Sequence, residues 1–165
     1  MQEAIYVLDA NVFIEASRRY YAFDLAPGFW DNLIRLADAD LIKSIDHIKR
    51  ELDKGKDELA AWVNHHFHHA FDSTNQSSIV RAYREIIKWV DSQSQFSDAA
   101  RADFASGADG WLVAYAKVYD GIVVTHEVAA PESKIKVPIP NICVAFNIQF
   151  IDTFEMLRAL GVILR

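Results

Sequence analysis

The sequence predicts an α/β fold in which helices cover both faces of a central parallel sheet, a three-layer α/β/α sandwich. Short apolar segments alternate with helical segments along the chain, as in right-handed strand–helix–strand crossovers. The first segment, Ile5 to Leu8, is apolar throughout, as expected for a strand that is buried on both faces. The length of 165 residues and the hydrophobic content of 52% predict a single domain over 1–165.

The elements can be predicted in order from their apolar periodicity and their boundary residues. Strands are expected over residues 5–8, 40–45, 121–124 and 149–152; "GIVVTHE", at 121–127, gives the clearest of these signals because it is β-branched and apolar through Val124. Helices are expected from about 11, over 28–39, from a cap at Asp46 through 51, over 56–72 and 77–90, from 97 or 98, between the glycines of 106–121, and over 141–148 and 153–160. Pro131, Pro138 and Pro140 predict a loop between the last two strands.

The composition limits the class of function. A net charge of −6 argues against a non-specific nucleic-acid coat protein, although it is compatible with a nuclease whose acids surround bound cations. A single cysteine excludes an intrachain disulfide framework and fits a reducing cytosol. The first residues lack the pattern of a signal peptide, and no apolar run approaches the roughly 18 residues that span a bilayer. We therefore expect a cytoplasmic protein with no membrane segment.

Two acidic residues directly follow predicted strands. Asp9 lies at the carboxyl end of the first strand, and Glu127 lies just past the end of the strand that finishes at Val124. In open parallel sheets, ligands bind outside the carboxyl ends of the strands, near the point where the strand order reverses. If these two strands are neighbours, both side chains reach the same crevice.

Two helices provide further acids. Asp109 lies in the first turn of its helix, at the end of an apolar stripe formed by Leu112, Val113 and Ala116, so it should point toward the end of the sheet. Glu51 follows Ile48 by three residues and flanks the inward face of its own helix. Four separate segments thus each provide one carboxylate on or beside a buried face.

Carboxylates packed together raise one another's pKa and oppose folding, and a divalent cation removes this penalty. Oxygen ligands favour Mg²⁺ or Mn²⁺ over zinc, and such a site suits phosphodiester hydrolysis. Simpler interpretations stay open for each acid. Asp9 with Asn11 can form an Asx turn that caps the next helix, Glu51 can be a solvated helix residue, Asp109 can be an N-cap and Glu127 can be a loop acid.

The order of four motifs resembles the PIN-domain family of metal-dependent ribonucleases. The motifs are "LDAN" at 8–11, "SIDHIKREL" at 44–52, "GADGWLVAYA" at 107–116 and "VVTHE" at 123–127. The resemblance extends from Tyr6 to about Phe154 and is greatest to toxin-like members of the kind found in VapC-type toxin–antitoxin pairs.

This resemblance implies a PIN-like fold and Mg²⁺- or Mn²⁺-dependent endonuclease action on an RNA substrate. It also implies an antitoxin protein as a partner, with homodimers common in the family. The four family acids fall on Asp9, Glu51, Asp109 and Glu127. The first three would bind the metal; the fourth is usually Asp, and the extra methylene of Glu127 favours an assisting role. Asn11 and Thr125 match polar positions that support the site.

Other polar residues yield weaker hypotheses. Basic residues near the predicted acids are candidates for contacts with RNA phosphates; they are Arg18, Arg19, Lys49, Arg50 and Lys54. On a regular helix, His65 would share a face with His68 and His69, a spacing that can bind a metal, although a closed zinc site needs four ligands. The simpler interpretation is a helix with Trp62 and Phe67 near the core and the histidines at the surface.

Two further functions therefore stand beside the nuclease. A catalytically inactive PIN-like module could bind RNA or protein, a reading favoured by the Glu at position 127 and by the acidic net charge. A metal protein based on His65 to His69 is the third hypothesis. The sequence does not name the RNA, the antitoxin or the number of metal ions.

Overall fold

Five parallel strands form the centre of the protein, as the computed structural model, which describes residues 4–164, shows. The strand order is β3-β2-β1-β4-β5. The strands are β1 (Tyr6–Leu8), β2 (Ile42–Ile45), β3 (Phe71–Asp72), β4 (Ile122–Val124) and β5 (Phe150–Ile151). All four pairings are parallel. The predicted central parallel sheet is therefore confirmed.

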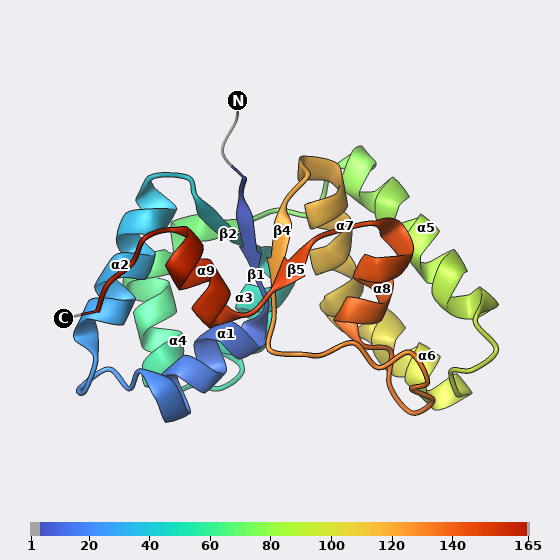
Figure 1. Ribbon diagram of the computed structural model, residues 1–165, viewed down its shortest axis with the longest axis horizontal. Helices are drawn as coiled ribbons and strands as arrows, with labels where there is room; N and C mark the ends of the chain where they lie inside the picture. Colours follow the sequence, from blue (N-terminus) through green and yellow to red (C-terminus); the bar gives the residue numbers. More distant parts are fainter. Residues whose placement is uncertain (1–3, 165) are drawn as a thin grey trace.

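Helices cover the sheet on two sides, which gives the predicted three layers. Figure 1 shows α1, α2, α4 and α9 on the left of the strands and α5, α6, α7 and α8 on the right. Their bounds are α1 (Ala10–Glu15), α2 (Pro27–Asp38), α3 (Asp46–Asp53), α4 (Glu58–Trp62), α5 (Ser77–Ser92), α6 (Asp98–Ser106), α7 (Asp109–Tyr119), α8 (Ile139–Phe146) and α9 (Thr153–Ala159). No helix in 4–164 is both long and apolar enough to cross a membrane.

The strand predictions hold at four places and miss the fifth. The observed strands β1, β2, β4 and β5 lie within the predicted ranges. Strand β3 lies inside the range 56–72, which the sequence pattern predicts as helix, so that prediction is wrong at its end. The pairing of Phe71 with Ser44 and of Asp72 with Ile45 supplies backbone hydrogen bonds from β2, and a local pattern cannot reveal such a partner.

Several helix boundaries differ from their predictions. Asp46 is the first residue of α3 and Ile45 is its cap, so the predicted cap at Asp46 is wrong. The Asp46 carboxylate accepts hydrogen bonds from the N–H of His47 and from the backbone and hydroxyl of Thr74. Helix α8 begins at Ile139, two residues before the predicted start, because Pro140 fits the first turn, where its missing N–H costs nothing. Helix α6 begins at Asp98, one of its two predicted starts, and Ser97 caps it.

The histidine-rich segment is not a regular helix. Residues Val63–Phe67 form a π-helical turn and His68–Ala70 a 3-10 turn, with the break at Phe67. The regular spacing assumed for His65 and His69 is therefore wrong. His69 Nε2 lies 2.9 Å from Asp38 Oδ1. Phe67 is buried, and the prediction that Trp62 and Phe67 lie near the core is confirmed.

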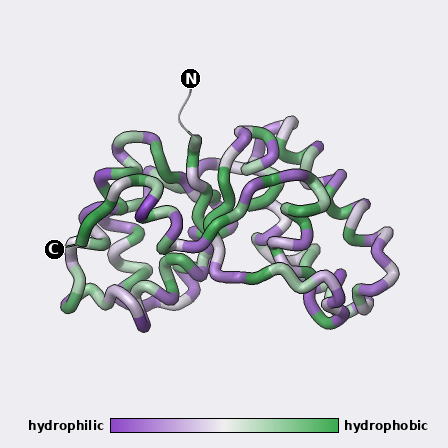
Figure 2. Tube along the Cα trace, viewed as in Figure 1, coloured by the Kyte–Doolittle hydropathy of each residue, from purple (hydrophilic) through white to green (hydrophobic). Residues whose placement is uncertain are grey.

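The core runs on both sides of the sheet. Figure 2 shows the strands as a hydrophobic centre with hydrophilic segments toward the periphery. Aromatic rings fill the layer beside α2 and α4; Trp30 stacks on Phe23 with ring centroids 4.1 Å apart and meets Trp62 edge-on at 4.8 Å. Such packing holds α2 and α4 against the strands, so the edge of the sheet is a rigid support for the side chains that follow β1 and β4.

Gly121 gives a direct test of this packing. A Cβ at Gly121 would lie 2.8 Å from Val7 Cγ2 and 3.2 Å from the Ile5 carbonyl, so Gly121→Ala should lower the free energy of unfolding by about 1–3 kcal/mol. The matched control is Gly28→Ala, in α2, where nothing lies within 4 Å of the added carbon; it should change stability by less than about 1 kcal/mol, toward greater stability. Urea unfolding measures both, and equal effects would contradict the packing.

Candidate active site

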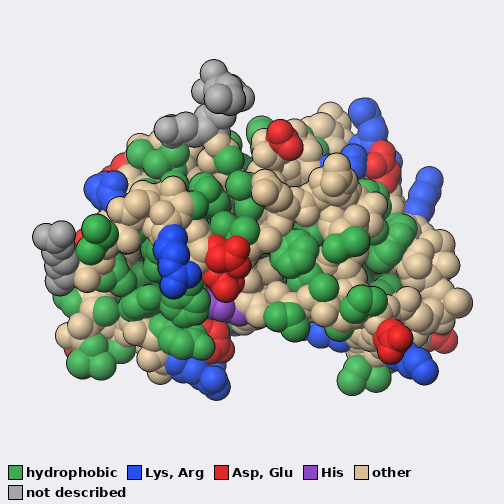
Figure 3. Space-filling view, viewed as in Figure 1, with side chains coloured by type: hydrophobic (Ala, Val, Ile, Leu, Met, Phe, Trp, Pro, Cys, Tyr) green, Lys and Arg blue, Asp and Glu red, His purple; other side chains and the backbone are tan. Residues whose placement is uncertain are grey.

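The switch point of the sheet lies between β1 and β4. The chain leaves β1 toward β2 on one side, whereas β4 pairs with β1 on the other. Leu8 is in register with Val124, and the N–H of Asp9 donates to the Val124 carbonyl at 2.9 Å. Asp9 and Thr125 therefore emerge side by side, as expected for residues that line a ligand site in an open α/β sheet. Figure 3 shows acidic side chains and a histidine near a notch between the two helical halves.

Asp9 is the most buried of the four candidate acids, with 3% of its surface exposed. Its Oδ1 accepts a hydrogen bond of 2.8 Å from the N–H of Ala10, which caps α1. Its Oδ2 accepts one of 2.9 Å from the hydroxyl of Thr125. The Asx-turn interpretation of Asp9 thus describes one carboxylate oxygen, and the other oxygen faces β4.

Thr125 connects Asp9 to Glu127. Its hydroxyl donates to Asp9 and accepts a hydrogen bond of 3.1 Å from the N–H of Glu127. Thr125 is itself buried, so it holds the Asp9 carboxylate in one orientation, which is the support role that the sequence predicts for it. Asn11 lies with Glu15, Tyr20, His126 and Glu127 around a hollow of about 280 Å³ beside the acids.

Asp109, in α7, and Glu51, in α3, lie near the carboxyl ends of the same strands. Asp109 is the first residue of α7, and Ala108 is the cap, so the N-cap interpretation of Asp109 is wrong. The stripe that follows it is buried as predicted, which turns the start of α7 toward the sheet. Asp109, Glu51 and Lys136 line one cavity of about 200 Å³.

The pKa values of Asp9 and Asp109 are raised by burial and by the charges of the neighbouring acids. Burial, chiefly, raises the pKa of Asp9 to about 7, with a further rise from the charge of Glu127. Burial also raises the pKa of Asp109 to about 8, with further rises from Asp9, Glu127 and Glu51. Glu51 is exposed as a residue and lines the cavity, and partial burial raises the pKa of its carboxyl group. The charges of Glu127 and Glu51 therefore act on both Asp9 and Asp109.

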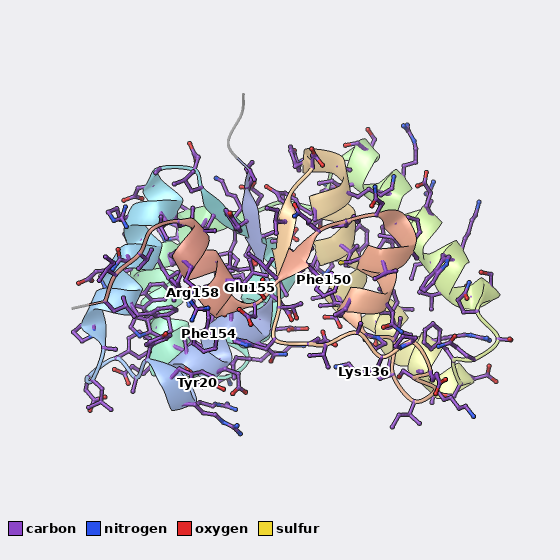
Figure 4. The ribbon with its side chains drawn as sticks, viewed as in Figure 1. Tyr20, Lys136, Phe150, Phe154, Glu155 and Arg158 are labelled. Carbon is purple, nitrogen blue, oxygen red and sulfur yellow. The ribbon has the colours of Figure 1, made fainter. Side chains whose placement is uncertain are left out.

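Lys136 is a charged neighbour that the sequence analysis missed. Its Nζ lies 2.9 Å from Glu127 Oε1, and the side chains are 57% and 12% exposed respectively. Figure 4 labels Lys136 on the connection between β4 and α8, which runs beneath the carboxyl ends of the strands. The sequence offers only one weak signal, a lysine in the proline-bounded segment that follows Glu127.

The donor set fits a hard divalent cation. All four acids offer oxygen ligands, and burial, with the charges of neighbouring acids, raises the pKa of Asp9 and of Asp109. Among the described residues, no three His, Cys, Asp or Glu side chains converge as a ready group of ligands, the histidine segment included. Mg²⁺ needs only one or two carboxylates and keeps several waters, so this donor set suffices for it.

The predicted RNA-contact residues are mostly paired with acids. Lys49 Nζ lies 2.8 Å from Asp53 Oδ2, and Arg50 lies 3.7 Å from Asp46. Arg19 pairs with Glu15 at 3.3 Å. Arg18 is exposed beside a small hollow next to α4, and Lys54 is exposed, with its charge lowering the pKa of Glu51.

A larger cavity lies at the opposite end of the strands, near their amino ends. Its volume is about 790 Å³, and its lining includes Ile5, Asp40, Gly121 and Gln149, which lie near the amino ends of the strands. None of the four candidate acids lines it. This cavity is larger than the one beside the acids. The acids with raised pKa values lie instead at the carboxyl ends of the strands, and we therefore place the candidate site there.

One solved structure shares this architecture. A chain of the crystal structure of VapBC2 from Rickettsia felis, bound to a DNA fragment from their promoter, matches with a TM-score of 0.56. The match covers 90% of this chain and 98% of that chain, at 14% sequence identity. The likeness shows the fold, and the PIN-like α/β/α arrangement that the sequence motifs predict is confirmed.

Sequence comparison gives the family. No curated protein matches the chain. The family model described as a domain of unknown function, DUF4411, matches residues 6–164, and the protein therefore belongs to the DUF4411 family.

Proposed function

We propose that the protein is a metal-dependent endoribonuclease that hydrolyses RNA phosphodiester bonds with Mg²⁺ or Mn²⁺. One observation carries the proposal: carboxyl groups from four separate segments meet at the switch point of a PIN-like sheet, and the most deeply buried of them, Asp9, has a pKa near neutrality. Buried acids with perturbed pKa values in a cleft are characteristic of functional sites.

Asp9, Asp109 and Glu51 would hold the ion, one or two of them directly and the remainder through bound water. A bound divalent cation supplies positive charge that activates a water and stabilises the charge that develops on the phosphate. The protein's part is to position the groups: Thr125 orients one oxygen of Asp9, and the start of α7 orients Asp109. Glu127 assists from the side of β4.

Binding of RNA would use cations beside the acids. Lys54 is the best candidate, because it is exposed and near Glu51. Lys49, Arg50 and Arg19 would exchange their carboxylate partners for phosphates, and Arg18 is exposed beside α4. Phosphate contacts of this kind position a nucleic acid without specifying its sequence.

We also propose that the protein is the toxin of a cytoplasmic toxin–antitoxin pair. The fold likeness to a chain of the VapBC2 structure supports this reading. An antitoxin would cover the surface at the carboxyl ends of the strands and prevent RNA from binding there. A homodimer is a second assembly that we propose. Copurification of a small neighbouring-gene product would support the pair, whereas growth that continues unchanged on expression of the protein alone would count against a toxin.

Removal of the metal tests the enzymatic proposal. Labelled RNA should be cleaved in Mn²⁺, and EDTA should lower the cleavage rate by roughly 10²–10⁴-fold, because metal charge supplies several kcal/mol of transition-state stabilisation. Gel electrophoresis of the products measures the rate, and a return of cleavage on adding excess Mn²⁺ is the control. RNA binding with no cleavage in Mn²⁺ or Mg²⁺ would favour the inactive module instead.

A further inference from the structure

The connection between β4 and α8 holds Lys136 in a defined position. The side-chain amide of Gln95 donates to the carbonyls of Pro131 and Ser133 at 2.8 and 3.0 Å. The Ser133 hydroxyl donates to the Lys136 carbonyl at 2.7 Å, and Val137, the next residue, is buried. The backbone is thus anchored on both sides of Lys136, which is unlike a lysine on a free surface loop.

The partner of Lys136 is an unusually buried acid. Glu127 is 12% exposed, the least of any acid in an ion pair among residues 4–164, where the other acids are 28% exposed or more. Exposed ion pairs contribute little to stability, whereas removing the partner of a buried charge is costly. Removal of the Lys136 ammonium would therefore leave the Glu127 carboxylate as an unpaired, mostly buried charge and destabilise the protein.

Lys136 also faces the other acids. It lines the cavity of about 200 Å³ together with Asp109 and Glu51. The ammonium places a positive charge beside Glu127, the acid that stays available for a second ion once Asp9, Asp109 and Glu51 are assigned to the first. A second divalent ion there would have to displace the ammonium or bear its repulsion.

We propose that Lys136 is a resident monovalent cation that takes the place of a second divalent ion, so that the site loads one metal ion per chain. Its ammonium keeps Glu127 out of metal ligation, and Asp9, Asp109 and Glu51 hold the single ion, one or two of them directly and the remainder through water. This inference rests on the proposed function, and it assigns the number of ions that the sequence leaves open.

Calorimetric titration of the full chain with Mn²⁺ tests the proposal, with electron paramagnetic resonance of free Mn²⁺ as a second count. Wild type should bind one ion per chain. Lys136→Met removes the ammonium and keeps the length of the side chain, so it should bind two. Lys134→Met is the matched control: it removes the same charge from the same loop, its side chain forms no ion pair within the described part of the chain, and it should bind one.

The double variant Glu127→Gln/Lys136→Met has no unpaired carboxylate at position 127, so it should fold even if Lys136→Met does not. It should bind one ion, because it lacks the Glu127 carboxylate that would bind the second. Two ions in wild type, or one ion in Lys136→Met that folds as wild type does, would overturn the role of Lys136 and leave the enzymatic proposal standing. Absence of any Mn²⁺ binding by wild type would instead overturn the metal site itself.

Discussion

Asp9→Asn should abolish metal-stimulated RNA cleavage while leaving the fold intact. The amide oxygen of Asn can still accept from the N–H of Ala10, and its NH₂ can donate to the Thr125 hydroxyl, so the two observed hydrogen bonds have replacements. The negative charge at the most buried position of the site is lost. We expect the cleavage rate to fall by roughly 10²–10⁴-fold, the effect of losing several kcal/mol of metal-dependent stabilisation.

Single-turnover cleavage of labelled RNA in Mn²⁺ measures this effect, and circular dichroism checks the fold. Asp91→Asn is a matched control, because Asp91 is exposed on α5 and its side chain has no hydrogen bond or ion pair among residues 4–164; its rate should equal that of wild type. A rate for Asp9→Asn within about threefold of wild type would reject Asp9 as a metal ligand, since loss of the charge would then be worth less than about 1 kcal/mol.

Asp109→Asn should stabilise the metal-free protein at alkaline pH. Burial raises the pKa of Asp109 in the folded protein to about 8, above the ordinary value of 3.8. The folded state thus favours the protonated form, and this contribution to stability is complete below about pH 4 and is lost as the pH rises to about 8. Asn carries no charge at any pH, so the stability of the variant relative to wild type should rise by roughly 3–4 kcal/mol between pH 5 and pH 8.

Thermal unfolding in EDTA at several pH values measures this gain, and the Tm advantage of the variant should grow by about 6–16 °C between pH 5 and pH 8 for a chain of this size. Mn²⁺ should narrow the difference, because it stabilises wild type by about 2.7 kcal/mol at 100 times its Kd, whereas the variant lacks one of the carboxylates of the metal site. Asp91→Asn should follow wild type in both conditions. A Tm difference between Asp109→Asn and wild type that does not change with pH would contradict a buried, uncompensated carboxyl at Asp109.

The structure argues against the hypothesis of a metal site formed by His65 to His69. His69 is engaged with Asp38, and the turn at Phe67 breaks the regular spacing on which a histidine metal site would depend. The acidic residues instead meet at the sheet edge, although a predicted role for each of them as a metal ligand still depends on the measurements above. The inactive module keeps one supporting feature, the engagement of Glu127 by Lys136, and the Mn²⁺ titration distinguishes it from the enzyme.

The fold class and the strands after which Asp9 and Glu127 lie could be predicted from the sequence, and the four candidate acids were named from it. This was possible because these signals are local: β1 is a short apolar run, Asp9 directly follows it, and the stripe behind Asp109 repeats at helical spacing. The order of the motifs then indicated the PIN-like fold. Whether the acids met was a question of topology, which the order of strands around β1 answered.

Strand β3, the break at Phe67 and the contact of Lys136 with Glu127 could not be predicted from the sequence. Each depends on a partner distant in sequence or on the path of a loop: β3 exists through pairing with β2, and Lys136 reaches Glu127 because Gln95 anchors the intervening chain. Local periodicity carries no information about such partners, since the free energy of a strand pair or an ion pair belongs to both members and to the geometry that joins them.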